Sequence, residues 1–181
     1  GIVFNAATSD IIIGGTQGND TAVVTQVGDR LNVSQSGFGS REFVASGISR
    51  IFFVGLGGDD VFRNHSTVNS SAFGGAGSDQ LIGGSGNDRL IGNSGDDYLF
   101  GGGDGSDSIF GGNLRDVIVG GAGDDLIGGG GGNDGISGGA GKDSIFGGDG
   151  NDFIFGGGDD DFLAGQAGGD TVVGGFGLDV L

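Results

Sequence analysis

The sequence predicts an all-β protein in which short coils stack into a parallel β-solenoid. Three observations lead to this fold class. A nine-residue period runs from residue 74 to residue 181, the sixth position of every unit is Asp, and the eighth position is always aliphatic. Self-similarity at a short fixed period is typical of solenoids, whose units become stable only when they stack.

Composition excludes several other classes of protein. Of 181 residues, 49 are Gly and none is Pro, Cys, Met or Trp. So much Gly argues against a helical domain, because each interior Gly costs a helix about 1 kcal/mol relative to Ala. The absence of Pro excludes collagen. The absence of Cys excludes disulfide scaffolds and thiolate metal sites.

The charge of the chain indicates which kinds of partner it does not bind. There are 24 acidic and 7 basic residues, a net charge of −17 at pH 7, and 23 of the acids are Asp. This charge predicts no nucleic-acid partner and no anionic membrane partner, since both attract Lys and Arg. No apolar run approaches 18 residues, so no membrane span is predicted. The preference for the short Asp indicates that the reach of the carboxylate matters, in turns or as a ligand.

Residues 1–73 are predicted to form irregular coils at the N-terminal end of one continuous solenoid. Short apolar runs at 11–13 and 51–54 suit buried strands. Gly28-Asp29 lies between two period-2 patterns and predicts a hairpin turn.

Two stretches of this segment look like decayed repeats. GGTQGNDTAV places Asp20, with one insertion, where the repeats have their Asp. GLGGDDVFR places Asp60 and Phe62 in phase with the sixth and eighth positions. Asp20 and Asp60 are therefore predicted as further metal ligands.

Residues 74–181 divide into twelve regular units, from GGAGSDQLI at 74 to the shortened GGFGLDVL at 174, with one insertion near Asp104. Glycines at positions one to four permit positive φ and predict a turn. Positions seven to nine predict a three-residue strand whose eighth side chain points inward. Two units then make one 18-residue coil, and stacked coils form two parallel sheets around an aliphatic core.

The sixth-position aspartates predict two columns of metal ligands. Adjacent coils lie about 4.8 Å apart, so bare carboxylates in a column would repel by about 0.8 kcal/mol per pair even in water. Bound cations would offset this repulsion. Carboxylate and carbonyl oxygens in a flexible turn favour Ca²⁺ over Zn²⁺ or Mg²⁺. The predicted ligands in the repeats are Asp79, Asp88, Asp97, Asp107, Asp116, Asp125, Asp134, Asp143, Asp152, Asp161, Asp170 and Asp179.

In these units the chain resembles the calcium-binding RTX nonapeptide family, because they match G-G-x-G-x-D-x-U-x. The resemblance implies a right-handed parallel β-roll with Ca²⁺ between units i and i+2, held by the sixth-position Asp and by backbone carbonyls. Twelve units give 12 − 2 = 10 such pairs, so up to about ten ions. The glycines expected to supply carbonyl oxygens are Gly75, Gly77, Gly84, Gly86, Gly121, Gly123, Gly130, Gly132, Gly139, Gly141, Gly148 and Gly150.

Some units depart from this pattern, and weaker or missing sites are expected there. Leu114 and Asp159 replace the fourth Gly, and Asn93 and Gln166 replace the second. The insertion near Asp104 lengthens one turn.

The sequence indicates no catalytic site. The only His, His65, lies beside Ser66, but adjacent residues of a strand point to opposite faces and no third member of a triad is evident. The paired acids Asp124 and Asp125 fall at repeat positions five and six, which calcium binding or solvation explains better than glycoside hydrolysis. The chain is therefore predicted not to be an enzyme.

Outward positions of the repeats carry unusually many apolar residues. Tyr98, Phe100, Phe153 and Phe155 fall at positions seven and nine of alternate units and so share one sheet. Contiguous exposed apolar surface is uncommon on a monomer and indicates a partner. The two ends of the stack add Ile2, Val3 and Phe4 and, at the other end, Leu181 as candidate interface residues.

These features favour a secreted, non-enzymatic structural protein at the cell surface or outside a bacterial cell. Without caps, a solenoid exposes pairing edges, so head-to-tail self-association into a filament or layer is expected. One alternative is an RTX module cut from a larger secreted enzyme or toxin. Another is a ligand-binding or ice-binding adhesin, although no outward column of Thr accompanies Asn87, Asn133 and Asn151. All three predict folding on calcium binding, since extracellular modules bind Ca²⁺ at about 10⁻⁴ to 10⁻³ M.

Overall fold

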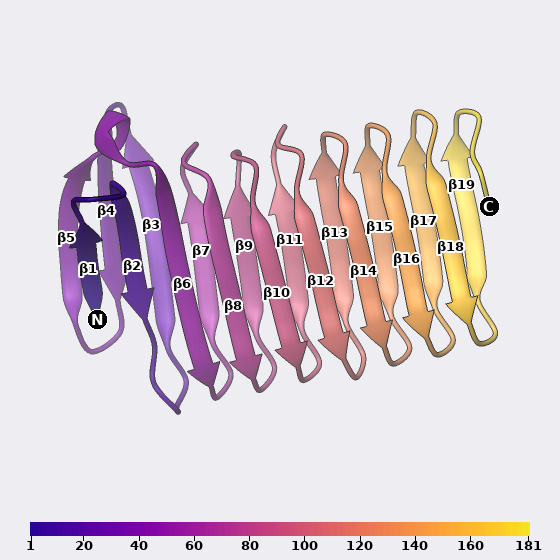
Figure 1. Ribbon diagram of the computed structural model, residues 1–181, viewed down its shortest axis with the longest axis horizontal. Helices are drawn as coiled ribbons and strands as arrows, with labels where there is room; N and C mark the ends of the chain where they lie inside the picture. Colours follow the sequence, from indigo (N-terminus) through magenta and orange to yellow (C-terminus); the bar gives the residue numbers. More distant parts are fainter.

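The computed structural model describes residues 1–181 as an all-β, parallel solenoid drawn out along one axis (Figure 1). In Figure 1 the even-numbered strands from β6 onward lie in front and run downward, the odd-numbered strands from β7 onward lie behind and run upward, and the chain advances toward its C-terminus. This winding is right-handed, as expected for parallel crossover connections. The predicted fold class is confirmed. No helix of the structure is long and apolar enough to cross a membrane.

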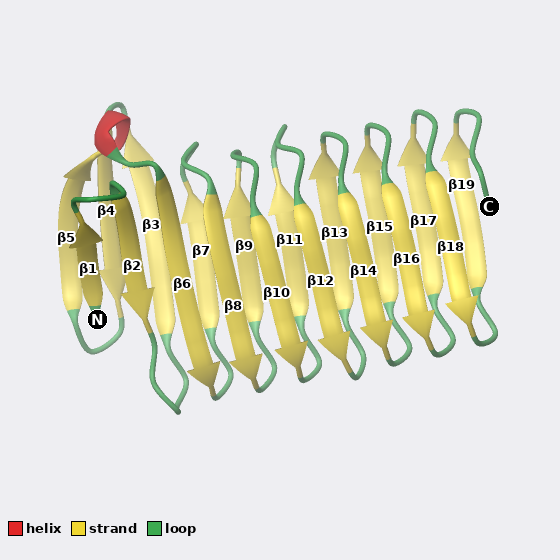
Figure 2. Ribbon diagram, viewed as in Figure 1, coloured by secondary structure: helices red, strands yellow, loops and turns green.

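The strands form two sheets that face each other. One has nine strands in the order β1-β2-β6-β8-β10-β12-β14-β16-β18, and the other has ten in the order β19-β17-β15-β13-β11-β9-β7-β3-β4-β5. Figure 2 shows the turns in two rows along the edges of the stack, with one short 3₁₀ turn, η1, at the N-terminal end. The elements are β1 Ile2–Asn5, β2 Asp10–Gly14, β3 Thr21–Val27, β4 Arg30–Gln35, β5 Gly39–Val44, η1 Ala45–Gly47, β6 Arg50–Gly57, β7 Val61–His65, β8 Ser70–Ala76, β9 Gln80–Gly84, β10 Arg89–Ser94, β11 Tyr98–Gly102, β12 Ser108–Asn113, β13 Val117–Ala122, β14 Leu126–Gly131, β15 Gly135–Ala140, β16 Ser144–Asp149, β17 Phe153–Gly158, β18 Phe162–Ala167 and β19 Thr171–Phe176.

The strands of the repeats are longer than the three residues predicted. Strand β14, for example, continues from positions seven to nine through the first three positions of the next unit. The glycines at these positions still pair in register with their neighbours, as Gly130 does with Gly148. The prediction of a three-residue strand was wrong because Gly, although suited to turns, does not prevent main-chain pairing with an identical coil on either side.

The eighth-position side chains fill the space between the sheets. They are fully or almost fully buried from Leu81 to Leu163, as the sequence predicted. Val172 is only partly buried, and Leu181 is 72% exposed.

The N-terminal residues continue both sheets and then close that end with antiparallel strands. Strands β2 and β3 pair in parallel with β6 and β7. Strand β4 pairs antiparallel with β3 through the predicted turn at Gly28-Asp29, which is confirmed, and β5 and β1 form the outer edges. Ile2 of β1 is 6% exposed and belongs to the core, so it is not available as an interface residue, whereas Val3 and Phe4 face solvent.

Candidate metal centre

The sixth-position aspartates lie in two buried columns, one along each row of turns. Those from Asp79 to Asp161 are at most 3% exposed, and the end members Asp170 and Asp179 are less covered. The structure therefore brings together, in register, the carboxylates that the period predicted to stack. Asp60 extends the first column, which is the one that contains Asp79, and is 1% exposed.

Each of these aspartates except Asp88, which accepts from Ser70, accepts a hydrogen bond from the aspartate of the preceding coil. The backbone N–H of Asp79 donates to Oδ1 of Asp97 over 2.8 Å, and that of Asp97 donates to Oδ1 of Asp116 over 2.8 Å. The second column repeats this contact from Asp88 to Oδ1 of Asp107 at 2.7 Å. One oxygen of each carboxylate is thus satisfied by the protein.

The other carboxylate oxygen is buried without a partner. Eleven aspartates have such an Oδ2, ten of them in the repeats. A charged oxygen without partners is costly to bury, so a ligand at these atoms would be strongly favoured. The eleven are Asp60, Asp79, Asp88, Asp97, Asp107, Asp116, Asp125, Asp134, Asp143, Asp152 and Asp161.

The first glycine of each unit makes room for this oxygen. A Cβ on Gly147 would lie less than 3.0 Å from both Oδ2 of Asp152 and the carbonyl oxygen of Gly165. The same pair of oxygens surrounds the first glycine of most other units, for example Gly138. In these units a carboxylate oxygen and a carbonyl oxygen of the following coil therefore lie beside the same glycine.

The carbonyl oxygens of the glycines predicted as metal ligands point along the stack, toward the next coil. The carbonyl oxygens of Gly84 and Gly77 lie less than 3.0 Å from the position that a Cβ on Gly102 or Gly95 would take. No three His, Asp or Glu side chains converge on one point. A cation beside Oδ2 would therefore be completed by main-chain carbonyls, which are the hard oxygen donors that Ca²⁺ accepts. The residues present fit calcium.

The four positions that depart from the glycine pattern stay in the positive-φ region, at smaller angles than glycines of neighbouring coils such as Gly112 at 128° and Gly132 at 138°. Asn93, Leu114, Asp159 and Gln166 all have positive φ, between 71° and 79°. The carbonyl oxygens of Asn93, Leu114 and Asp159 also point at the glycine of the following coil, as those of glycines do. The expectation of weaker calcium sites at these units stays a prediction, and their positive φ is strained for a residue with a Cβ.

Leu114→Gly is expected to stabilise the calcium-bound roll by about 1 kcal/mol, because the left-handed conformation costs Leu about 1–2 kcal/mol and Gly almost nothing. Leu114 is 60% exposed, so little packing is lost. The urea midpoint in saturating Ca²⁺ measures the effect. Leu114→Ala, which keeps the Cβ, should gain nothing, and an equal gain for both variants would contradict the explanation.

The inserted residue near Asp104 does not interrupt the second column. Gly105 takes the place of the fourth glycine, with its Cβ position against the carbonyl oxygen of Gly86. The bonds from Asp88 to Asp107 and from Asp107 to Asp125 remain at 2.7 and 2.8 Å.

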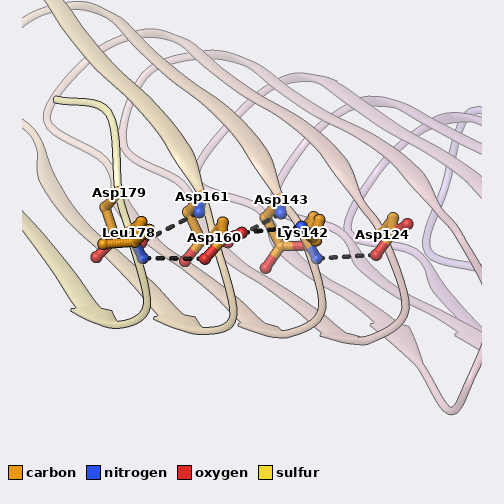
Figure 3. A network of polar contacts seen from close by, with 7 residues as sticks. All are labelled: Asp124, Lys142, Asp143, Asp160, Asp161, Leu178 and Asp179. Atoms are coloured by element: carbon orange, nitrogen blue, oxygen red, sulfur yellow. Dashed lines mark hydrogen bonds and ion pairs between the residues drawn. The ribbon is translucent and has the colours of Figure 1, made fainter.

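A second ladder of side chains, at position five, was missed from the sequence. Each Asn or Asp there accepts the backbone N–H of the residue one coil further on. Figure 3 shows Asp124 accepting from Lys142 at 2.8 Å and Asp160 from Leu178 at 3.0 Å. The exposed Lys142 ammonium also pairs with Asp160 at 2.9 Å. The direction of donation is opposite to that in the aspartate columns: here the earlier coil accepts, and there the later coil accepts. The recurrence of Asn and Asp just before the sixth position is the sequence signal that could have predicted this ladder.

The buried carboxyls have raised pKa values. Burial, which disfavours the charged form, is the main cause throughout. It raises the pKa of Asp79, Asp107, Asp116 and Asp143 to about 7 and that of Asp88, Asp97 and Asp125 to about 6. The pKa values of Asp60, Asp134, Asp152 and Asp161 are raised for the same reason.

In chelator, lowering the pH from 7.5 to 5.5 is expected to increase the β-sheet circular dichroism signal. In the folded chain these carboxyls have pKa values near 6 to 7, so they are largely protonated at pH 5.5. In the unfolded chain the same carboxyls have pKa values of about 4 and are ionised at that pH. The stability from protonation is therefore present at low pH and is lost as the pH rises through 6 to 7. At pH 5.5 the chain still carries a net negative charge, because this pH is above its isoelectric point of about 4.1. A signal that falls or does not change on acidification would contradict this.

The other residues that the sequence analysis singled out lie outside the two aspartate columns. His65 is exposed and Ser66 is buried, and Ser66 donates its hydroxyl to Asn64. Tyr98, Phe153 and Phe155 are 39%, 56% and 38% exposed on the outer face of the ten-stranded sheet.

Two comparisons with known proteins bear on this geometry. A family model described as RTX calcium-binding nonapeptide repeat (4 copies) matches residues 73–104, 101–136, 129–163, 137–172 and 146–181. A search of curated proteins found none that matches the chain.

Proposed function

Because the chain belongs to the RTX calcium-binding nonapeptide repeat family, we propose that it is a secreted, non-enzymatic structural protein that folds when it binds calcium. Repeats of this family bind Ca²⁺, form a structural β-roll and occur in secreted bacterial proteins. The calcium level that such a protein meets outside the cell is high enough to fill sites of about 10⁻⁴ to 10⁻³ M. Export would then couple folding to arrival outside.

The observation that carries the proposal is the row of unpartnered Oδ2 atoms. Ten repeat aspartates, from Asp79 to Asp161, have one, and ten is also the number of unit pairs that twelve units provide. This agreement supports up to ten ions in the repeats, and Asp60 adds a candidate for one more. Without cations, ten buried carboxylates would either take up protons or unfold the roll.

Calcium titration of the chelated chain at pH 7.5 is expected to produce the β-sheet signal cooperatively between about 10⁻⁴ and 10⁻³ M. Calorimetry should report several ions per chain, and the same concentration of Mg²⁺ should not replace Ca²⁺, because Mg²⁺ demands a tighter octahedral site. An unchanged β signal in excess chelator at this pH would overturn the proposal.

We also propose that the stack is extended by a second copy of the chain, head to tail. At the C-terminal end β19 is an unpaired edge strand, and Phe176, Leu178 and Leu181 are 85%, 84% and 72% exposed. At the other end β1 is an edge with Val3 and Phe4 exposed. Unpaired edges with apolar side chains are templates for further β-pairing, and contacts between unlike ends propagate into filaments.

Electron microscopy of the chain in millimolar Ca²⁺ and in chelator tests this assembly. Filaments or chains of particles are expected in Ca²⁺ only. Phe176→Asp, which places a charge beside the β19 edge, should shorten them, while Leu114→Asp, at an exposed turn in the middle of the stack, should not. Monomers in both solutions would contradict self-assembly and favour the alternative that the chain is a module of a larger secreted enzyme or toxin.

A further inference from the structure

The two aspartate columns start, at the N-terminal end of the stack, with turns of a different kind. The first column starts with Asp20, whose backbone N–H donates to Oδ1 of Asp60 over 2.7 Å. The second column starts with Ser70, whose backbone N–H donates to Asp88 just as an aspartate does elsewhere. Neither starting turn contains an unpartnered carboxylate oxygen.

Oδ2 of Asp20 is satisfied by the protein itself. Its Oδ2 accepts the backbone N–H of Thr16 at 2.6 Å and the Thr16 hydroxyl at 2.9 Å. The same oxygen of Asp60, one coil further on, has no partner. Asp20 was predicted to be a calcium ligand; its Oδ2 holds its own turn through these two hydrogen bonds and so is not left without a partner as those of the repeats are.

The turn between β7 and β8 replaces carboxylates with a buried amide. Residues 64–69 read NHSTVN and contain no acid. Asn64 is fully buried, and its Oδ1 accepts the N–H of Ser66 at 3.1 Å and the Ser66 hydroxyl at 2.6 Å. Its Nδ2 donates to the carbonyl oxygen of Val68 at 2.9 Å. Hydrogen bonds from one side chain thus hold this turn closed.

The same turn is tied to the N-terminal hairpin. The backbone N–H of Thr67 donates to Oε1 of Gln26 in β3 at 3.0 Å. On its other side the turn supports the first regular coil, because the N–H of Ser85 donates to the carbonyl oxygen of Ser66 at 3.2 Å. It therefore joins the antiparallel N-terminal strands to the repeats.

Charge and core distinguish the two parts of the chain in the same way. Residues 1–73 contain 6 acids and 4 bases, a net charge of −2, whereas residues 74–181 contain 18 acids and 3 bases, a net charge of −15. The N-terminal core holds the stacked rings of Phe53 and Phe62, with centroids 5.2 Å apart. Self-repulsion is thus small in residues 1–73, where only Asp60 leaves a buried carboxylate oxygen without a partner, and this segment has aromatic contacts in its core.

We infer that residues 1–73 fold without calcium and serve as the template on which the calcium-dependent coils form in order toward the C-terminus. A solenoid coil contacts only its neighbours, so folding spreads from an end that is already formed. The inference rests on the proposed calcium dependence of the repeats and adds a fixed starting point and a direction. Asp60 holds the one buried, unpartnered carboxylate oxygen of residues 1–73, against ten in residues 74–181, so the need for calcium falls almost entirely on the repeats.

Hydrogen exchange of the full chain, read by mass spectrometry, tests the inference. In chelator at pH 7.5, amides of β2 to β6 are expected to exchange at least about tenfold more slowly than those of residues 92–181. As Ca²⁺ is added, protection should reach residues 74–100 before residues 147–181. Fast exchange throughout the chain in chelator, or protection that appears first at the C-terminal coils, would overturn the inference and leave the proposed function intact. Protection of the whole chain in chelator would overturn both.

A matched pair of variants separates the template from an ordinary coil. Asn64→Ala removes the amide that closes the N-terminal turn, and Asn151→Ala removes a position-five amide that accepts the N–H of Gly169 at 2.7 Å. Asn64→Ala is expected to raise the calcium midpoint of residues 74–181 about tenfold, and Asn151→Ala less than about twofold, because only the first change affects the starting coil. If Asn64→Ala abolishes protection of β2 to β6 and the midpoint is unchanged, the repeats need no template and the inference fails.

Discussion

Asp125→Asn is expected to destabilise the roll with calcium bound and to stabilise it without calcium. Asn has nearly the same shape and can still accept the N–H of Asp107, which Asp125 does at 2.8 Å. Without calcium a neutral amide replaces a buried carboxylate whose pKa is raised to about 6, a gain of about 1–3 kcal/mol. With calcium a negative charge is lost beside the bound ions, and the calcium midpoint should rise about tenfold.

Two measurements check these opposite signs. The calcium midpoint at pH 7.5 measures the loss of stability with calcium bound. The β-sheet signal in chelator measures the gain of stability without calcium. Asp124→Asn is the matched control, since Asp124 is the preceding residue, is exposed, and accepts only the N–H of Lys142. That control should change stability by less than about 0.5 kcal/mol. Destabilisation by Asp125→Asn both with and without calcium would show that its carboxylate has a structural role other than holding a cation.

Gly138→Ala is expected to lose about 1–3 kcal/mol of stability and to weaken calcium binding at its turn, because the new methyl group fills the space kept for Oδ2. The added Cβ would lie less than 3.0 Å from Oδ2 of Asp143 and from the carbonyl oxygen of Gly156. Neither atom can move away freely, since Asp143 is held in its column and Gly156 belongs to the next coil.

Gly135→Ala, in the same strand β15, is the control for this change. A Cβ at Gly135 meets nothing within 4 Å, and its φ is not in the left-handed region. Ala there should be neutral or stabilising by up to about 1 kcal/mol, because Gly loses more conformational freedom on folding. Urea midpoints in saturating Ca²⁺ measure both variants. Equal losses at the two positions would contradict a role for the first glycine in shaping the metal site.

Most of the fold could be predicted from the period alone. A nine-residue repeat with one inward aliphatic residue has few ways to bury that residue, and two units per coil satisfy the hydrogen bonds of both sheets. Leu81 and Ile127 therefore lie where the pattern placed them. The hairpin at Gly28-Asp29 was also predictable, because its turn chemistry is local.

The details of the site could not be predicted in the same way. The sequence indicates that Asp97 and Asp116 stack, but not that Asp116 accepts the N–H of Asp97 through one oxygen and leaves the other free. That choice depends on how neighbouring coils are placed against each other, which only the folded structure shows. The roles of Asp20 and Asn64 were hidden for a related reason, since their hydrogen bonds are made inside turns without a repeat pattern.

The sequence by itself determined the class of fold, the two columns of aspartates and the inward aliphatic residues, because each follows from a period that is repeated twelve times. Only the tertiary structure decided which carboxylate oxygens are left without partners and which turns are closed by the protein's own hydrogen bonds. The physical reason is that donors and acceptors lie mostly 18 or 19 residues apart in the repeats, and only the stacking of coils in register brings them within 3 Å or so of each other.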